Sequence, residues 1–553
     1  MSEIKDDAQV TKPAQTSQQS GRIPDVGRTG SLNRRGRAAL TRLVPDPAGL
    51  CARGAVTGLE PKWLPKYAAL TGTKIGELPS VTSEDIPSVF AVARAAQRSW
   101  SQTRIPERRQ RIMHFFELVT HLHDQLLDLI QWENGKNRGS AYEEVYDVAA
   151  NAKYYARIAG RTLRDERVPG AVPLLTKTVV HHKPRGVVGI ISPWNYPLTL
   201  AISDALPALI AGNAVVLKPD SQTPYTALAM KSLLERAGFP PDLLQVVIGS
   251  GRELGTPIID NADYVMFTGS SATGASIAEQ CGARLIEFSA ELGGKNPLIV
   301  RADAPVTRAA RGARKACFAS SGQLCVSIER IYVHTDIWDR FVPAFVERVK
   351  AMRVGASMKW SDKMGPLISQ EQFDKVRNHV EDAVAKGARV LCGGKPLPEV
   401  SELAWAPTVL TDVTPEMDLY AQETFGPVVS LYRVDSDEEA LRLANHTSYG
   451  LNAAVWTGNL REGARLAERI HAGGVNVNDG YAATWGSIGA PSGGVKRSGI
   501  SHRHGVGGLL KYTEPQTVAL QHLMHLEAPK LLGEYRWADA LHTWLKIGRL
   551  FRR

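Results

Sequence analysis

The chain has 553 residues, of which 43% are hydrophobic, and it carries a formal net charge of +10 at pH 7. A chain of this length and composition buries a large core and divides into more than one domain. Its five cysteines include no CxxC pair and no His/Cys cluster, which argues against a disulfide framework or a structural zinc site and favours free thiols in a reducing compartment.

The N-terminal segment is polar. Its first residues are rich in Ser, Gln and Thr and lack the apolar region of a secretory signal. Because almost nothing in it can be buried, we expect residues 1–40 to form a disordered tail. No run of about 18 apolar residues follows, which argues against a membrane span, so we expect a cytoplasmic protein. Much of the basic excess lies near the two ends. The middle of the chain has no compact Lys/Arg stripe with interleaved aromatic residues, so we expect no nucleic-acid binding.

The hydrophobic pattern then predicts helices followed by a parallel sheet. Between residues 83 and 160 apolar residues recur at three- and four-residue spacing, which is typical of helices. TKTVVHH (176–182) predicts a strand that leaves the main body. Short β-branched runs alternating with helix-like segments then predict a doubly wound α/β sheet. These runs are GVVGIIS (186–192), NAVVLKP (213–219), LLQVVIG (243–249), DYVMFTGS (263–270) and ARLIEFS (283–289).

Residues that can carry chemistry follow several of these runs. In SPWNYP (192–197), Asn195 either caps the next helix or presents an N–H donor to a developing oxyanion. Lys218 suits a phosphate or a ribose, although a solvated lysine is equally common at such a place. FTGS (267–270) resembles a phosphate-cradling turn but lacks the GxGxxG spacing.

Two further candidates lie after the last run. Glu291, which precedes a Gly-Gly pair, is either a general base or an ordinary surface glutamate. Cys325, in SSGQLCVS (320–327), is one thiol among five and, taken alone, is better explained as a small buried residue than as a nucleophile. Neither residue decides the function by itself.

Taken together and in order, SPWNYP, KPxxxTP, FTGSxxxG, ELGGKNP, GQLC and ETFGPV resemble the motifs of the aldehyde dehydrogenase superfamily. The resemblance implies that Cys325 attacks an aldehyde, that Asn195 forms the oxyanion hole with the Cys325 backbone N–H, and that Glu291 activates water to hydrolyse the thioester. It implies no metal. It also implies a nicotinamide cofactor site formed by Trp194, Lys218, Ser221, Gly269, Ser270, Glu423 and Phe425.

The resemblance also implies an architecture. Residues 41–165 and 184–292 would form the dinucleotide-binding domain, and residues 293–495 an α/β catalytic domain. Residues 166–183 and 508–520 would form a small β flap for oligomerisation, which implies a homodimer or a homotetramer.

The cofactor and the aldehyde follow from individual positions. Ser221 stands where NAD-preferring members often carry a glutamate. Without that carboxylate a 2′-phosphate is not repelled, and Lys218 attracts it. We therefore expect NADP as the cofactor, with NAD possible. The motifs look most like actinobacterial-type succinic-semialdehyde dehydrogenases that use NADP. Better-known enzymes of that specificity bind the distal carboxylate with two arginines, where this chain has Ser203 and Ala319. Another aliphatic or aromatic aldehyde is therefore the alternative substrate.

The last segment, residues 528–553, predicts an amphipathic helix. Trp537, Leu541 and Trp544 recur on one face, with basic residues around them. Such a stripe packs on the enzyme or on a neighbouring subunit, or contacts a membrane surface peripherally. Contact with a membrane would allow an alternative function, that of a membrane-associated scaffold with a dehydrogenase fold. The intact Cys325, Asn195 and Glu291 argue against this alternative.

Overall fold

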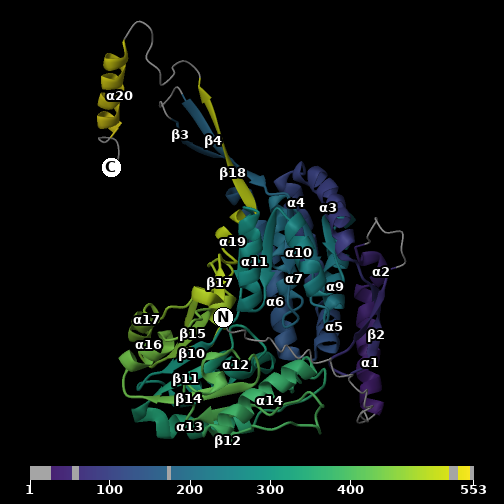
Figure 1. Ribbon diagram of the computed structural model, residues 1–553, viewed down its shortest axis with the longest axis vertical. Helices are drawn as coiled ribbons and strands as arrows, with labels where there is room; N and C mark the ends of the chain where they lie inside the picture. Colours follow the sequence, from purple (N-terminus) through teal and green to yellow (C-terminus); the bar gives the residue numbers. More distant parts are fainter. Residues whose placement is uncertain (1–25, 53–60, 171–175, 522–532, 549–553) are drawn as a thin grey trace, which may run out of the picture.

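The computed structural model describes residues 26–52, 61–170, 176–521 and 533–548 (Figure 1). Two α/β bodies are built on separate sheets, one of six strands and one of seven, and a three-stranded sheet projects away from them. Among the described residues, no helix combines the length and the apolar character needed to cross a membrane.

The six-stranded sheet forms the core of the first body, in the order β17-β9-β8-β5-β6-β7. β5 to β9 pair in parallel, and β17 joins β9 antiparallel. Almost every residue of β5, β6 and β8 is buried, as expected for a sheet covered by helices on both faces. The predicted doubly wound α/β fold is confirmed. The strands are β5 (Val187–Ile191), β6 (Ala214–Lys218), β7 (Leu244–Val246), β8 (Tyr264–Thr268), β9 (Phe288–Glu291) and β17 (Gly499–Ile500).

Helices from two parts of the chain cover this sheet. Trp100 donates to the carbonyl of Leu209 at 2.7 Å, and Gln97 donates to the carbonyl of Gly212, so the early helices are tied to the strand connections. The helices are α2 (Pro47–Leu50), α3 (Ile86–Ser101), α4 (Ile105–His121), α5 (His123–Asn134), α6 (Arg138–Thr162), α7 (Thr199–Ile202), α8 (Ala205–Ala211), α9 (Pro224–Arg236), α10 (Gly251–Asn261) and α11 (Ser271–Ala283). A hairpin of β1 (Trp63–Tyr67) and β2 (Lys74–Pro79) lies before them, and short 3₁₀ turns occur at Ser83–Asp85 and Pro241–Leu243.

The N-terminal segment departs from its expected disorder. Helix α1 (Val26–Leu43) packs on α5, so the prediction is wrong for residues 26–40, while residues 1–25 lie outside the described residues. Arg35 makes two hydrogen bonds to Asp128, at 2.6 and 3.1 Å. A Cβ on Gly36 would lie 2.1 Å from the Trp132 ring, so glycine permits this close approach. The helix is stable because it has a partner surface, which composition alone does not reveal.

The seven-stranded sheet forms the second body, in the order β12-β13-β14-β11-β10-β15-β16. All its pairs are parallel except β12 with β13. Its strands are β10 (Asn296–Val300), β11 (Ile328–His334), β12 (Arg389–Cys392), β13 (Thr408–Thr411), β14 (Val428–Val434), β15 (Asn452–Trp456) and β16 (Gly474–Val477). Its helices are α12 (Val306–Phe318), α13 (Thr335–Lys350), α14 (Gln370–Ala385), α15 (Asp418–Ala421), α16 (Asp437–Asn445), α17 (Leu460–Ala467) and α18 (Ala482–Trp485), with 3₁₀ turns at Ala319–Gly322 and Lys496–Ser498.

The projecting sheet consists of β3 (Glu166–Pro169), β4 (Thr176–Pro184) and β18 (Thr513–Gln521), all antiparallel. The strand expected from residue 508 begins only at Thr513, because α19 (Gly507–Leu510) precedes it. Helix α20 (Glu534–Gly548) lies beyond this sheet in Figure 1, away from both bodies. Trp537 is buried and Trp544 is 44% exposed. The remainder of the predicted C-terminal helix, residues 528–532 and 549–553, lies outside the described residues.

Candidate active site

Cys325 lies in a tight loop between α12 and β11. Ser320 and Ser321 adopt left-handed φ values of 49° and 59°, and Gly322 has φ 69°. A Cβ on Gly322 would lie 2.0 Å from the carbonyl oxygen of Gly426, so only glycine fits there. The loop is therefore held in a strained, fixed conformation against the segment that carries ETFGPV.

Two asparagines hold the backbone around the thiol. Asn296 donates through its carboxamide to the carbonyls of Cys325 and Ser327, both at 2.7 Å. Asn452 donates to the carbonyl of Val326 at 2.8 Å. Each is the first residue of its strand, and the two strands, β10 and β15, are parallel neighbours. The second body therefore fixes the position of the nucleophile.

Asn195 lies beyond the end of β5 and reaches the same loop. Its side chain is buried, and its amide nitrogen donates to the carbonyl of Gln323 at 3.1 Å, two residues before Cys325. The amide of Asn195 thus lies at the boundary between the two bodies. A carboxamide N–H beside the thiol is the donor geometry that an oxyanion hole requires.

A buried ion pair fixes the Asn195 turn. Lys136 donates to the carbonyl of Asn195 at 2.5 Å and pairs with Glu144 at 2.7 Å, and both charged side chains are fully buried. The other Glu144 oxygen accepts from the backbone N–H groups of Leu198 and Thr199, at 2.8 and 3.2 Å. The pair therefore satisfies the orphan donors at the start of the next helix and orients the turn before it.

Glu291 ends β9 and is paired in register with Thr268 on β8. The Thr268 hydroxyl accepts from the guanidinium of Arg503 at 2.5 Å, and the same guanidinium donates to Asp204 at 2.7 Å. A permanent positive charge therefore lies next to the candidate base. Within the part of the chain that the structure describes, Glu291 Oε1 is buried without a hydrogen-bond partner.

Burial raises the pKa of Glu291 to about 7. The positive charges of Arg503 and Lys511 and a hydrogen bond from the backbone of Gly494 oppose this rise, while Asp204 adds to it. A carboxyl group with a pKa near neutrality exchanges protons readily at physiological pH, as general acid–base catalysis requires.

Burial also favours the protonated form of the Cys325 thiol. Burial raises its pKa to about 12, and the nearby carboxylates of Glu423 and Glu291 raise it further, while Arg503 lowers it. The thiol is therefore protonated at neutral pH in this state. Attack on an electrophile therefore requires that the thiol first lose its proton.

Glu423 and Phe425 are positioned by a second buried ion pair, formed by Lys295 and Glu329. Glu329 accepts from the backbone N–H groups of Thr424 and Phe425, at 3.0 and 2.9 Å. The carboxylate of Glu423 accepts from the N–H of Gly294 at 2.8 Å. This segment thus closes over the Gly-Gly turn that follows Glu291.

Phe425 also reaches across to the first body. Its φ is 56°, and its ring meets the ring of Trp194 edge to face, with centroids 5.6 Å apart. Trp194 directly precedes Asn195, so this aromatic contact lies beside the oxyanion donor.

A cleft of ≈570 Å³ opens at the carboxyl ends of the strands in the first body. Trp194, Lys218 and Gly269 line it, and a Cβ on Gly269 would lie 2.5 Å from the Phe267 ring. The remaining lining includes Ser192, Asp220, Arg252, Thr256, Thr273 and Gln280. Two cations, several hydroxyl groups and the N-terminus of α11 together fit a phosphorylated dinucleotide.

The two serines expected at the cofactor make local contacts. Ser221 donates to the carbonyl of Gly249 at 3.0 Å. Ser270 caps α11 by accepting from the N–H of Thr273 at 3.2 Å. Ser270 thus satisfies a backbone donor at the start of α11, and neither serine is among the residues that line the cleft.

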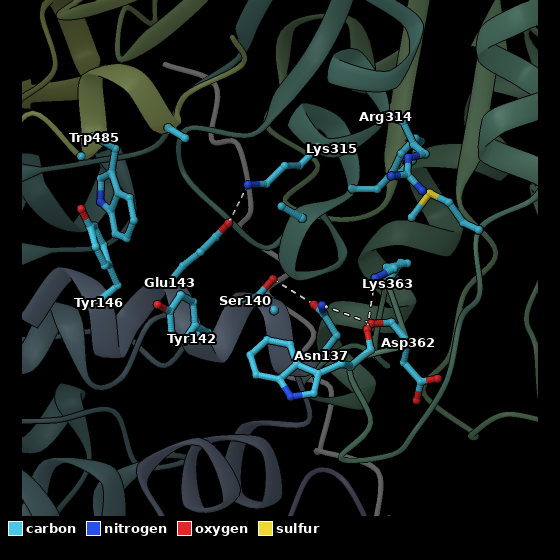
Figure 2. Close-up of a pocket in the computed structure, with 17 residues that line it drawn as sticks. Asn137, Ser140, Tyr142, Glu143, Tyr146, Arg314, Lys315, Asp362, Lys363 and Trp485 are labelled. Atoms are coloured by element: carbon cyan, nitrogen blue, oxygen red, sulfur yellow. Dashed lines mark hydrogen bonds and ion pairs between the residues drawn. The ribbon is translucent and has the colours of Figure 1, made fainter. Parts of the chain in front are cut away.

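A second pocket, of ≈480 Å³, is lined by residues of α6, α12 and α18 (Figure 2). Ala319 lines it. Ser203 instead donates to Asp147 at 2.9 Å. Ala319 packs in one apolar cluster with Tyr196, Leu200, Leu324 and Tyr481, and this cluster continues from the residues next to Asn195 and Cys325 to the pocket.

The structure thus brings Cys325, Asn195 and Glu291 to one place. Three of the residues expected at the cofactor line the cleft of the first body, namely Trp194, Lys218 and Gly269. The other four are not among its lining residues, namely Ser221, Ser270, Glu423 and Phe425. Sequence reasoning missed Arg503, Asp204, Lys136 and Arg252. A signal for Lys136 was its place in Gly135-Lys136-Asn137 at the start of α6, a charged residue between two predicted helices. Arg503 and Asp204 are separated by 299 positions, and nothing in their local sequence links them.

Comparison with known proteins agrees with this arrangement. The family model described as "Aldehyde dehydrogenase family" matches residues 58–518. A protein of Mycolicibacterium smegmatis named "Putative succinate-semialdehyde dehydrogenase (NADP(+))" is 51% identical over 482 residues, which covers 87% of this chain and 93% of that protein. A Mycobacterium tuberculosis protein with the same name followed by "2" is 51% identical over 85% of this chain and 91% of its own length.

Solved structures give the same result. An aldehyde dehydrogenase from Brucella melitensis biovar abortus 2308 superposes with a TM-score of 0.80 at 32% identity, covering 87% of this chain and 99% of that one. The NAD+ complex of an aldehyde dehydrogenase from Bacillus cereus gives a TM-score of 0.79 at 34% identity, covering 83% and 93%. The chain belongs to the aldehyde dehydrogenase family.

Proposed function

We propose that this enzyme oxidises succinic semialdehyde to succinate with NADP, through a thioester on Cys325. The observation that carries the proposal is the convergence of the Cys325 loop, the Asn195 amide and the buried Glu291 carboxyl group. The names of relatives that are 51% identical over most of the chain support the choice of substrate and cofactor.

The three residues divide the chemistry. The Cys325 thiol loses its proton to solvent water, and its sulfur attacks the aldehyde carbon. The Asn195 amide and the Cys325 backbone N–H bind the resulting oxyanion, and removing one such donor typically costs on the order of 10²–10³ in rate. A nicotinamide held in the cleft lined by Trp194, Lys218 and Gly269 would supply the hydride acceptor, and loss of hydride from the adduct would leave an acyl group on the sulfur. Glu291 then takes a proton from water, which attacks the thioester and releases the carboxylate and the thiol.

The cofactor cleft favours a phosphorylated ribose. Lys218 and Arg252 both line it, and burial lowers the pKa of Lys218, with Asp220 opposing that change. The Ser221 hydroxyl replaces the carboxylate that would repel a 2′-phosphate. We therefore propose NADP as the preferred cofactor, with NAD as a weaker substitute.

The assembly and the division into domains are further proposals. We propose that residues 41–165 and 184–292 bind the dinucleotide, that residues 293–495 carry the catalytic cysteine, and that β18 and β4 join subunits into a homodimer or a homotetramer. Most side chains of β18 are exposed, which supports an interface along this strand. We further expect the enzyme to act in the cytoplasm, and α20 to pack on a neighbouring subunit rather than on a membrane surface.

Steady-state kinetics tests the proposal. The values of kcat/KM are compared for aldehydes of varied length and charge, with NADP and with NAD at saturation. The proposal predicts that succinic semialdehyde with NADP gives the highest value. A higher kcat/KM for an uncharged aldehyde contradicts the substrate, and a higher value with NAD contradicts the cofactor.

A further inference from the structure

The pocket in Figure 2 adjoins the apolar cluster that packs beside Cys325. Phe318 and Ala319, at the end of α12, line it together with Ala482. Ala319 and Ala482 also belong to the apolar cluster that contains Leu324, the neighbour of the nucleophile. The pocket therefore lies on the side toward which an aldehyde at Cys325 would extend its chain if it followed these apolar side chains.

The ion pair between Lys315 and Glu143 lies at the wall of the pocket. Lys315 lies one helical turn before Ala319, so both side chains project from the same face of the chain. The Lys315 amine is 3.2 Å from Glu143 Oε1, and Figure 2 shows the two side chains pointing toward each other across the pocket. The Lys315 side chain is 59% exposed, so it is free to change its conformation within the cavity.

Glu143 has other partners that remain if the lysine moves. The hydroxyl of Tyr196 donates to it at 3.2 Å, and the hydroxyl of Tyr481 donates at 3.1 Å. Because both tyrosines are buried in the apolar cluster, these hydrogen bonds hold the carboxylate at a fixed place. Lys315, on a flexible stem with three donors, is the mobile member of the group.

We propose that Lys315 binds the carboxylate of the aldehyde substrate, and that Glu143 competes with that carboxylate for the lysine. The inference rests on the proposed function and names the residue that replaces the arginine expected at Ala319. An anionic aldehyde offers Lys315 a second carboxylate without leaving Glu143 unpaired, since the tyrosine hydroxyls still donate to it. An uncharged aldehyde of the same length gains nothing at this end of the pocket.

The other anion in the pocket does not compete for the lysine. Asp362 is paired with Arg353 at 2.9 Å, and the Ser357 hydroxyl also donates to it. Arg314, on the same helix as Lys315, adds a second positive charge to the lining. The local potential therefore favours an anionic end group over a cationic one.

The test compares Lys315→Met and Glu143→Gln by the ratio of kcat/KM for succinic semialdehyde to that for butanal, which has the same length and no charge. Lys315→Met is expected to lower this ratio by about 10- to 100-fold, the value of a hydrogen bond to a charged group. Glu143→Gln is expected to raise the ratio, because it removes the competing charge and keeps the tyrosine contacts. Lys315→Arg is expected to restore most of the preference.

Lys363→Met provides the matched control. This lysine lines the same pocket, but its amine donates to the carbonyl of Trp360 at 3.1 Å, and its replacement is expected to leave the ratio within 2-fold of the wild type. Unchanged thermal unfolding of each variant excludes a loss of fold. Competitive inhibition by succinate supplies a second readout, since its Ki is expected to rise in Lys315→Met and fall in Glu143→Gln.

The outcomes separate the two proposals. An unchanged ratio in Lys315→Met, with the wild type preferring succinic semialdehyde, overturns this inference alone. If the wild type prefers another anionic aldehyde and Lys315→Met loses that preference, the inference holds and the proposed substrate is wrong. If 4-trimethylammoniobutanal is preferred and Glu143→Gln abolishes its turnover, the pocket binds cations and both proposals fail.

Discussion

Arg503 and Asp204 form a buried ion pair, in which Nε of the guanidinium donates to the carboxylate at 2.7 Å. Nη2 of the same guanidinium donates to the hydroxyl of Thr268, which is paired with Glu291 across two strands. Burial acts to lower the pKa of Arg503, but Asp204 and Glu291 overcome it and hold the pKa above its usual value. Burial likewise acts to raise the pKa of Asp204, yet Arg503 and Lys511 bring it to about 2. The site therefore contains a fixed positive charge within electrostatic range of both the base and the thiol.

Removing that charge should shift the pH dependence of the reaction. Arg503 favours the ionised form of Glu291, so Arg503→Gln is expected to raise the Glu291 pKa above about 7. Hydrolysis of the thioester needs the ionised carboxylate, so the acid limb of the kcat profile should move to higher pH by about one unit. Arg503→Lys retains a charge and should show a smaller shift. An acid limb that stays in place in Arg503→Gln would show that this charge does not tune the base.

Replacing the base itself should separate the two half-reactions. Glu291→Gln keeps the shape of the side chain but accepts no proton at neutral pH, so steady-state turnover is expected to fall by about 10²–10⁴-fold. Because the thiol loses its proton to water and not to Glu291, a stopped-flow trace should still show a burst of about one NADPH per active site. Turnover equal to that of the wild type, without a burst, would remove Glu291 from the mechanism.

The buried pair Lys136–Glu144 should matter for both stability and rate. Lys136→Met leaves Glu144 uncompensated and is expected to lower the free energy of unfolding by about 3–5 kcal/mol, as measured in urea. Because Lys136 also donates to the carbonyl of Asn195, kcat should fall at temperatures where the variant remains folded. Asp263→Asn, which weakens a partly exposed ion pair with Arg94, serves as the comparison. It should lower the free energy of unfolding far less. Full activity in folded Lys136→Met would separate the pair from the oxyanion turn.

Arg252 should contribute to the choice of cofactor. It lines the cleft beside Lys218, and its removal takes away a positive charge that attracts a 2′-phosphate. Arg252→Ala is expected to raise the KM for NADP by about 10-fold and to change the KM for NAD much less. Equal changes in the two KM values would place the phosphate elsewhere.

The sequence predicted much of the site because its motifs follow buried strands. Asn195, Lys218 and Glu291 each lie at or just beyond the end of such a strand, and parallel strands bring these ends to one edge of the sheet. The family resemblance joined Cys325 to them, which no local pattern around the thiol did.

The features that the sequence did not predict depend on contacts between segments that are distant in the chain. The Arg503–Asp204 pair and the Lys136 contact to Asn195 join residues with no common pattern, so only the folded chain reveals them. Helix α1 was missed for a related reason, since its few apolar residues suffice only because the α5 surface receives them. The Lys315–Glu143 pair joins two helices from different bodies and was equally hidden.

Mass spectrometry of the digested protein tests the central claim, a thioester on Cys325, most directly. Glu291→Gln is mixed with NADP and succinic semialdehyde, quenched in acid and digested, and the modified peptide is identified. The proposed mechanism predicts one succinyl group per chain, on the peptide that contains Cys325, and none when Cys325→Ser is added. A succinyl group on another cysteine, or one that persists in the double variant, would contradict it.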